Sequence, residues 1–163
     1  MELFDNINQV KSLLDKVILQ TLELVEEDLT IKISIEKLTN EGALNLAKTR
    51  YTQGSSSVSI TQLPTEDEEK EFKALRTVER NEDDTAMQFT LESHEIDKDN
   101  DYIDPMHWFG ILTPQTLKTA RDKYQKAIEL SVESANVRQR IAKNTELIQK
   151  LKYVKLQFET NEE

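Results

Sequence analysis

Two long stretches of this chain carry apolar residues at seven-residue intervals, and this periodicity constrains the fold more than any other feature. In the first stretch, from Leu3 to about Tyr51, the repeat occupies Leu3, Val10, Val17, Leu24, Ile31 and Leu38. Further apolar residues widen the stripe: Ile7, Leu14, Ile18, Leu22, Val25, Leu29 and Ile35. Such a repeat keeps one apolar seam of a helix facing a partner helix. The β-branched stretch Thr30–Ile35 alternates as a strand would, but the unbroken repeat favours a helix.

The second stretch, from Pro114 to about Phe158, predicts another long helix. Its seam consists of Leu130, Val137, Leu151 and Phe158, with Ala127, Ile141 and Ile148 interleaved. Asn144 falls in the same register. It is either a buried residue that fixes the register of the helices or a partly exposed residue near a fraying end. Thr113 followed by Pro114 is typical of a helix start, because a hydroxyl can cap it and proline needs no backbone donor there.

Two seamed helices of similar length bury both seams most simply by folding back on each other. We therefore predict an all-α fold, a long antiparallel helical hairpin of the coiled-coil type, about 65–70 Å long. Residues 1–54 would form the first helix, and 105–163 would form a corner and the second helix of the same structural domain. Residues 55–104 would form an acidic, partly disordered insert. This insert has room for a short β-hairpin that pairs Ser57–Leu63 with Met87–Leu91.

The acidic residues in excess lie in one central segment. The formal net charge is −10, and the segment from Glu66 to Asp104 alone holds 15 acidic and 5 basic side chains, a net of −10. A block of this kind repels nucleic acid and anionic lipid. The N-terminal residues are acidic where a signal peptide would be positive, and no apolar run approaches the roughly 20 residues of a membrane span. We predict a soluble protein without a nucleic-acid partner.

The residues that usually carry chemistry are sparse. The chain has no cysteine, two histidines without metal-ligand spacing and three glycines without a phosphate-binding pattern. Asp97, Asp99 and Asp101 alternate as in a calcium loop, but Tyr102 stands where that loop needs glycine. We interpret these aspartates as a solvated acidic loop. The sequence therefore predicts neither an enzyme nor a metal or cofactor site.

The bulkiest apolar residues gather in the corner "DPMHWFGILTP", from Asp104 to Pro114. This corner resembles a block that opens the C-terminal helix in the coiled-coil assembly factors of the vacuolar proton ATPase, D-P-x-x-W-F-G-I-L-x-P-x-x-L. The matching residues are Asp104, Pro105, Trp108, Phe109, Gly110, Ile111, Leu112, Pro114 and Leu117. A second stretch, "LAKTRYTQGSSSVS" from Leu46, is similar to that family's L-A-K-x-R-Y-x-x-G-x-x-S-V. Together the two blocks cover about a quarter of the chain, whereas the acidic run between them matches poorly.

The resemblance implies a non-enzymatic chaperone that helps to assemble the membrane sector of the ATPase, and thereby supports vacuolar or lysosomal acidification. It also implies work at the cytosolic face of the endoplasmic reticulum and in the early secretory pathway. The implied partners are a membrane-embedded assembly factor and membrane-sector subunits. The chain would reach them by associating peripherally with the membrane, without a span of its own.

Both matching blocks would meet where the first helix ends and the second begins. The candidate partner-binding residues are Trp108, Phe109, Gly110, Ile111, Leu112, Arg50 and Tyr51. Trp108 would anchor a partner, since tryptophan is enriched in binding hot spots, and Gly110 would permit the bend. The alternative is that the cluster only closes the hairpin, and that Arg50 and Tyr51 only terminate a helix.

Two other functions suit the same pattern. A prefoldin-like chaperone subunit also has two long terminal helices around a small β region. A purely structural coiled coil would need no client at all. The sequence leaves the oligomeric state open.

Overall fold

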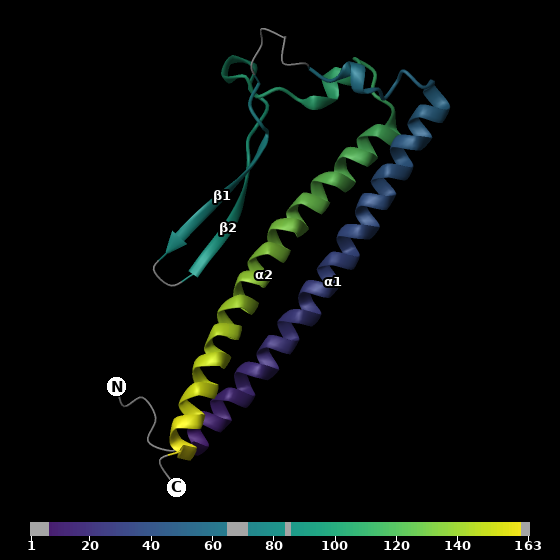
Figure 1. The fold of residues 1–163 in the computed structure, drawn as a ribbon. Helices are drawn as coiled ribbons and strands as arrows, with labels where there is room; N and C mark the ends of the chain where they lie inside the picture. Colours follow the sequence, from purple (N-terminus) through teal and green to yellow (C-terminus); the bar gives the residue numbers. More distant parts are fainter. Residues whose placement is uncertain (1–6, 65–71, 84–85, 161–163) are drawn as a thin grey trace.

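The computed structural model describes residues 7–64, 72–83 and 86–160, and its framework is a pair of long antiparallel helices (Figure 1). Helix α1 spans Ile7–Gln53 and helix α2 spans Gln115–Thr160. With 47 and 46 residues, each helix is about 70 Å long. The end of α1 and the start of α2 lie together at one extreme of the molecule (Figure 1). The predicted helical hairpin is therefore confirmed, with helix bounds within a few residues of those expected.

The seven-residue repeat forms the buried seam between the helices. Near the open end, Val10, Leu14 and Val17 pack around Leu151, and half-buried Phe158 joins them. Farther along, Leu24 and Ile31 pack on Val137. Along the seam, the residue numbers of α1 increase while those of α2 decrease, as an antiparallel pairing requires. The stretch Thr30–Ile35 is helical throughout, and Leu3 lies outside the described residues.

The assignment of one wide stripe to α1 is wrong in part. Leu22, Val25 and Leu29, which were expected to widen the seam, are exposed. At about 100° per residue, they lie on the side of α1 opposite Leu24 and Ile31. Helix α1 therefore has two apolar faces, and α2 covers only one of them.

Polar groups also lie in the seam. Buried Asp28 accepts a hydrogen bond of 2.5 Å from the Ser134 hydroxyl and forms a 2.6 Å ion pair with Lys32. The hydrogen bonds from Lys32 and Ser134 lower the pKa of the Asp28 carboxyl. Asn144 is half-buried beside Leu24. Its burial is therefore intermediate between the two alternatives, a buried seam residue and an exposed residue near a fraying end.

Gly42 serves packing between the helices. It is buried, and a Cβ built at this position would lie 2.9 Å from two ring carbons of Tyr124. A carbon pair at that separation repels strongly. Gly42 thus lets the Tyr124 ring of α2 lie directly on the backbone of α1.

The segment between the helices contains an antiparallel β-hairpin. Strand β1, Arg76–Asp83, pairs with β2, Ala86–Ser93, so that Arg76 faces Ser93 and Arg80 faces Phe89. A β-hairpin was expected, and Met87–Leu91 lies in β2, but its predicted partner was wrong. Ser57–Leu63 instead contains a short 3-10 helix, η1, at Ile60–Gln62. The strand partner comes from the charged run after Leu75, where alternation of apolar residues is nearly absent.

Residues 55–104 were expected to form a partly disordered insert, and within them Arg76–Asp83 forms β1. Residues 65–71 of that predicted insert lie outside the described residues.

Strand β2 is fixed to α2 by one side chain. The Asn136 carbonyl oxygen accepts from the backbone N–H of Phe89 at 2.7 Å, and its amide nitrogen donates to the Phe89 carbonyl at 2.8 Å. Asn136 thereby occupies the place that a further strand would take on the outer edge of β2. An ion pair of 3.8 Å between Arg76 and Glu129 adds a second contact between the hairpin and α2.

Candidate functional site

The end of the hairpin where the helices connect brings both sequence blocks together. We call this end the tip and define it as residues 48–64 and 105–118. The hydroxyl oxygens of Thr49 and Thr116 lie 2.6 Å apart and join the two helices there. Thr49 is itself buried, as are Leu117 and Ala120 in the first turns of α2. Residues of the two helices therefore contribute to closing the seam at this end.

The corner is built on a short 3-10 helix, η3, at Pro105–Phe109. The Asp104 carboxylate caps it by accepting a 2.9 Å hydrogen bond from the Met106 N–H. Pro105 suits the first position because it has no N–H to satisfy, and Met106 is buried. The second Asp104 oxygen lies 4.0 Å from the Arg121 guanidinium, so the corner is tied to the first turns of α2.

Gly110 makes the bend that was predicted for it. Its φ is +107° and its ψ is 172°, a backbone conformation that is essentially restricted to glycine. A Cβ at Gly110 would meet nothing within 4 Å, so the requirement for glycine comes from the backbone alone. Immediately after the bend, Ile111 is 99% exposed and Leu112 is 93% exposed. The chain thus presents two large apolar side chains to solvent.

Trp108 lies differently from these two residues. It is half-buried, and its ring meets Phe72 edge to face, with centroids 5.2 Å apart and planes at 71°. Phe109 is also half-buried. Phe72 comes from the segment before β1, so this contact joins the corner to the hairpin segment. The indole is engaged within the chain, and the pair Ile111 and Leu112 forms the exposed apolar part of the corner.

The end of α1 contributes two more exposed residues. Arg50 lies in the last turn of α1 and is exposed, as is Tyr51, at 91%. Gly54 follows with a φ of +94° and releases the chain from the helix. Tyr51 and Trp108 lie at the same end of the molecule, as expected. The tip therefore presents Tyr51, Arg50, Ile111 and Leu112 from two separate segments.

The short helix η1 adds an apolar residue that sequence reasoning missed. The Ser59 N–H donates to the Gln62 side chain at 2.9 Å, and the Ser59 hydroxyl accepts from the Thr61 N–H. This capping box holds η1 in the loop after α1, and Ile60 on it is 82% exposed. The four most exposed large apolar side chains among the described residues, Tyr51, Ile60, Ile111 and Leu112, all belong to the tip.

The tip also differs in charge from the rest of the chain. The sequence contains no Asp or Glu from position 42 to 65 or from 105 to 121, whereas the whole chain has a formal charge of −10. Within the tip, Lys48, Arg50 and Lys118 supply positive charge. A count of charge by segment would have revealed this acid-free end. The tip therefore combines exposed apolar side chains with an excess of positive charge.

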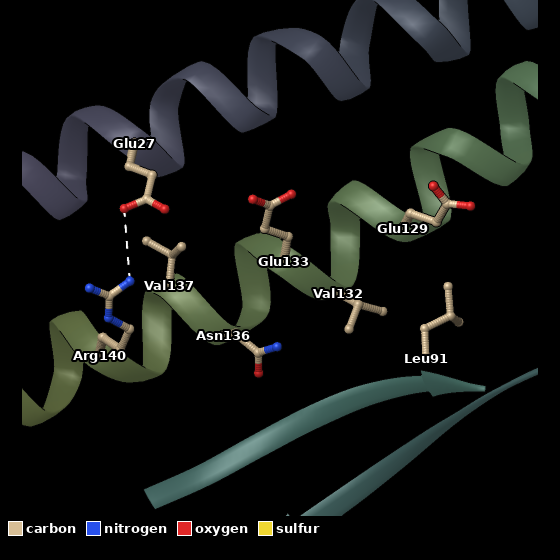
Figure 2. Close-up of a pocket in the computed structure, with 8 residues that line it drawn as sticks. All are labelled: Glu27, Leu91, Glu129, Val132, Glu133, Asn136, Val137 and Arg140. Atoms are coloured by element: carbon tan, nitrogen blue, oxygen red, sulfur yellow. Dashed lines mark ion pairs between the residues drawn. The ribbon is translucent and has the colours of Figure 1, made fainter.

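A groove lies along α2, away from the tip, between β2 and Glu27 of α1. Its volume is about 410 Å³, and it is lined by Glu27, Leu91, Glu129, Val132, Glu133, Asn136, Val137 and Arg140 (Figure 2). Glu27 of α1 and Arg140 of α2 approach to 3.9 Å across it. Exposed pairs of this kind contribute at most about 1 kcal/mol. Its charged groups link the elements that form the groove.

The acidic loop before the corner is organised by its own hydrogen bonds. The Asp97 carboxylate accepts from the Asn100 side chain at 2.7 Å and from the Asp99 N–H at 3.0 Å. These bonds hold the pKa of Asp97 below its ordinary value, with Asn100 the main cause. Within residues 7–64, 72–83 and 86–160, no cluster of three or more potential ligands is placed to hold a metal ion. Across the same ranges, no helix carries an apolar stretch that could cross a bilayer.

Comparison with known proteins identifies several similar chains. A Homo sapiens protein named Vacuolar ATPase assembly protein VMA22 is 28% identical over 149 residues, which is 78% of this chain and 83% of that protein. A Danio rerio protein of the same name is 27% identical over 165 residues, 76% of this chain and 79% of its own length. No family model matches the chain. The resemblance inferred from the two sequence blocks is confirmed, because these relatives carry the name of that group of assembly proteins.

Proposed function

We propose that this chain is an assembly factor of the vacuolar ATPase and that it acts without catalysing a reaction. The similarity to proteins named for this role extends over about three quarters of the chain and carries the proposal. The long, thin hairpin supports it physically, because such a rod offers extended surface for protein contacts. In this proposal the two helices act as one supercoiled coiled-coil unit. Residues 1–54 and 105–163 form this unit, and residues 55–104 are an insert between them.

The client that we propose is the membrane sector of the ATPase. The chain would work at the cytosolic face of the endoplasmic reticulum and in the early secretory pathway, where it would associate peripherally through a membrane-embedded assembly factor. Contacts between proteins would supply the specificity, and no cofactor takes part.

The tip is the surface that we assign to this partner, through the residues Trp108, Phe109, Gly110, Ile111, Leu112, Arg50 and Tyr51. Their roles differ. Ile111, Leu112 and Tyr51 are almost fully exposed and would be buried in the complex, where each large apolar side chain gains about 1.5–3 kcal/mol on full burial. Arg50 would meet an acidic group of the partner. Trp108 and Gly110 would hold the exposed pair in position, one by packing on Phe72 and the other by its bend.

The test is affinity purification of tagged full-length protein from detergent-solubilised cells, followed by identification of the captured proteins. The double variant Ile111→Asp with Leu112→Asp removes the exposed apolar pair without touching the buried seam. We expect it to lose membrane-sector subunits of the ATPase or their assembly partners by at least about tenfold. The matched control is Leu156→Asp, which replaces an exposed residue of α2 at the far end of the hairpin.

Undiminished capture by the double variant would refute the assignment of the tip. Absence of any vacuolar ATPase subunit or assembly partner from the wild-type sample would refute the function itself. Trp108→Ala separates the roles within the corner. If this variant stays folded and still captures its partner, Trp108 does not act as an anchor.

The prefoldin-like alternative predicts a different size in solution. A subunit of that kind would elute as part of a large hexamer when its companion subunits are present. We expect the purified chain to elute as a small elongated species until its membrane partner is added.

A further inference from the structure

Helix α1 carries a second apolar stripe on the face that points away from α2. Its members are Leu19, Leu22, Val25, Leu29 and Ile33. All five are 48–61% exposed. Their spacing of three and four residues places them on one side of the helix over about four turns. In a chain of which 32% is charged, a continuous stripe of this kind marks an interaction surface.

No described element of the chain covers this stripe. Helix α1 contacts α2 extensively, and the β-hairpin packs on α2 through β2 rather than on α1. Figure 1 shows the hairpin on the side of α2 away from α1. We call this surface the outer stripe of α1.

The charged residue that interrupts the stripe and the two that flank it most closely on the same face are acidic. Asp15 precedes the stripe, Glu26 interrupts it and Glu36 follows it, and all three fall on the same side at about 100° per residue. None of these three carboxylates forms an ion pair within the described ranges. Lysines occur on this face only beyond the stretch, at Lys11 and Lys37. A partner must therefore bring positive charge to three points spread over about 31 Å.

A second copy of this chain does not meet that requirement. In the antiparallel register that stacks Leu22 on Leu29 of the other copy, the two-fold axis passes between Val25 and Glu26. Both Glu26 carboxylates then face each other. The same register places Asp15 opposite Glu36 of the other copy. A parallel register sets each carboxylate against its own equivalent. Like charges that face each other are destabilising in both of these registers.

An anionic membrane surface does not fit either. Helices that lie in the membrane interface border their apolar face with lysine and arginine. The outer stripe is bordered by carboxylates, which anionic headgroups repel. Its narrow shape and helical spacing match the seam of another helix instead.

We propose that the outer stripe of α1 binds an amphipathic helix of a different protein, in which lysine or arginine residues border a leucine- or isoleucine-rich seam. The bound helix lies along α1 and completes a three-helix layer with α2. Its basic residues meet Asp15, Glu26 and Glu36, and its seam covers Leu22 and Leu29. This site is separate from the tip and does not depend on it.

The probe is a pair of fluorescein-labelled designed helical peptides of about 28 residues. Both carry the same leucine seam and differ only at the three positions that face the carboxylates, which are lysine in one peptide and glutamate in the other. Fluorescence anisotropy with the full-length protein measures both affinities. We expect the lysine peptide to bind at least about tenfold more tightly than the glutamate peptide, since three exposed charge pairs supply that difference.

Two variants of the protein sharpen the measurement. The double change Leu22→Asp with Leu29→Asp should weaken binding of the lysine peptide by at least about tenfold. The triple change Asp15→Lys, Glu26→Lys and Glu36→Lys should reverse the preference, so that the glutamate peptide binds more tightly. A merely structural role of these carboxylates would not produce a reversal. The matched control Leu44→Asp replaces another exposed leucine of α1 outside the stripe and should leave both affinities unchanged.

Several results would overturn the proposal. These are equal affinity for the two peptides, no measurable binding of either, or an unchanged preference in the triple variant. Sedimentation that reveals a dimer abolished by Leu22→Asp would assign the stripe to a second copy instead. The tip variant Ile111→Asp with Leu112→Asp should bind the lysine peptide like wild type, so failure at the tip and failure at the stripe are distinguishable.

Discussion

The outer faces of the two helices have opposite surroundings, although both helices contribute to the same seam. On α2, the outer face carries the β-hairpin, which Asn136 holds at Phe89 and where Val132 and Leu91 line a shared groove. On α1, the outer face carries apolar residues and nothing described covers them. The comparison teaches that apolar periodicity locates a face of a helix but not its partner. The β-hairpin covers the outer face of α2, and no described element covers the outer face of α1.

The largest expected effect is a difference in unfolding free energy between substitutions on the two faces of α1. Leu24→Ala removes a side chain that packs with Ile31 and Val137 and should lower the free energy of unfolding by about 2–5 kcal/mol. Leu22→Ala, two residues away on the outer stripe, should change it by less than about 0.5 kcal/mol, because that side chain is already exposed. Urea denaturation of both variants measures the difference. Equal losses would mean that the outer stripe is buried in the isolated protein.

The second prediction concerns the attachment of the β-hairpin to α2. Asn136→Ala deletes both hydrogen bonds to Phe89 and leaves two backbone groups without a protein partner, at a cost of about 1–3 kcal/mol. Hydrogen exchange at the Phe89 amide should accelerate accordingly. Asn144→Ala is the control, since Asn144 is a half-buried residue of the same helix like Asn136 but lies beside Leu24 rather than at β2. Unchanged protection of Phe89 would show that packing alone holds the β-hairpin on α2.

A smaller effect tests the closest approach of the two helices. Alanine in place of glycine usually stabilises a helix by about 1 kcal/mol. Gly42→Ala should instead destabilise the protein by about 1–2 kcal/mol, because the new Cβ would lie 2.9 Å from the Tyr124 ring. In a Tyr124→Leu background the same change should become neutral or stabilising. A stabilising Gly42→Ala in the wild-type protein would contradict the close packing of Tyr124 on α1. Thermal unfolding of the four proteins measures these changes.

The smallest expected effect concerns the charged group in the seam. Lys32 and Ser134 lower the folded-state pKa of Asp28 below its ordinary value of 3.8. The carboxylate therefore stabilises the fold at pH values above that ordinary pKa, and this contribution is lost as the pH falls through the lower folded pKa. Between about pH 6 and pH 2.5, wild type should lose up to about 1 kcal/mol more stability than Asp28→Asn, since Lys32 is half in solvent. Parallel pH profiles of the two proteins in urea denaturation would contradict the role of this pair.

The seven-residue repeat was sufficient to predict both helices and their common seam. Val10, Val17, Leu24 and Ile31 are buried as the repeat requires, and the strand-like stretch Thr30–Ile35 follows it. The β-hairpin was predicted only in outline. Strand β1 has charged residues on both sides of Val78, so its pairing with β2 depends on backbone hydrogen bonds that leave no apolar pattern in the sequence.

The sequence predicted where the candidate residues would gather, but not which of them would be exposed. The two sequence blocks that resemble the assembly factors meet at the tip because an antiparallel hairpin must join its helices there. The sequence cannot separate Trp108 from Ile111, since both are large and apolar and lie three residues apart. Contact with Phe72, which is 36 residues away in the chain, half-buries the first. The backbone turn at Gly110 exposes the second.

The sequence by itself determined the helices, because periodicity of 3.5 to 3.6 residues is a local property that each segment carries alone. It also determined the acid-free tip and the acidic centre, which are counts along the chain. Only the tertiary structure decided that part of the apolar stripe of α1 stays uncovered, where β2 lies and which tip residues stay in solvent. Those outcomes depend on which distant side chains come within contact distance, and helical periodicity does not show how wide a stripe one partner helix covers.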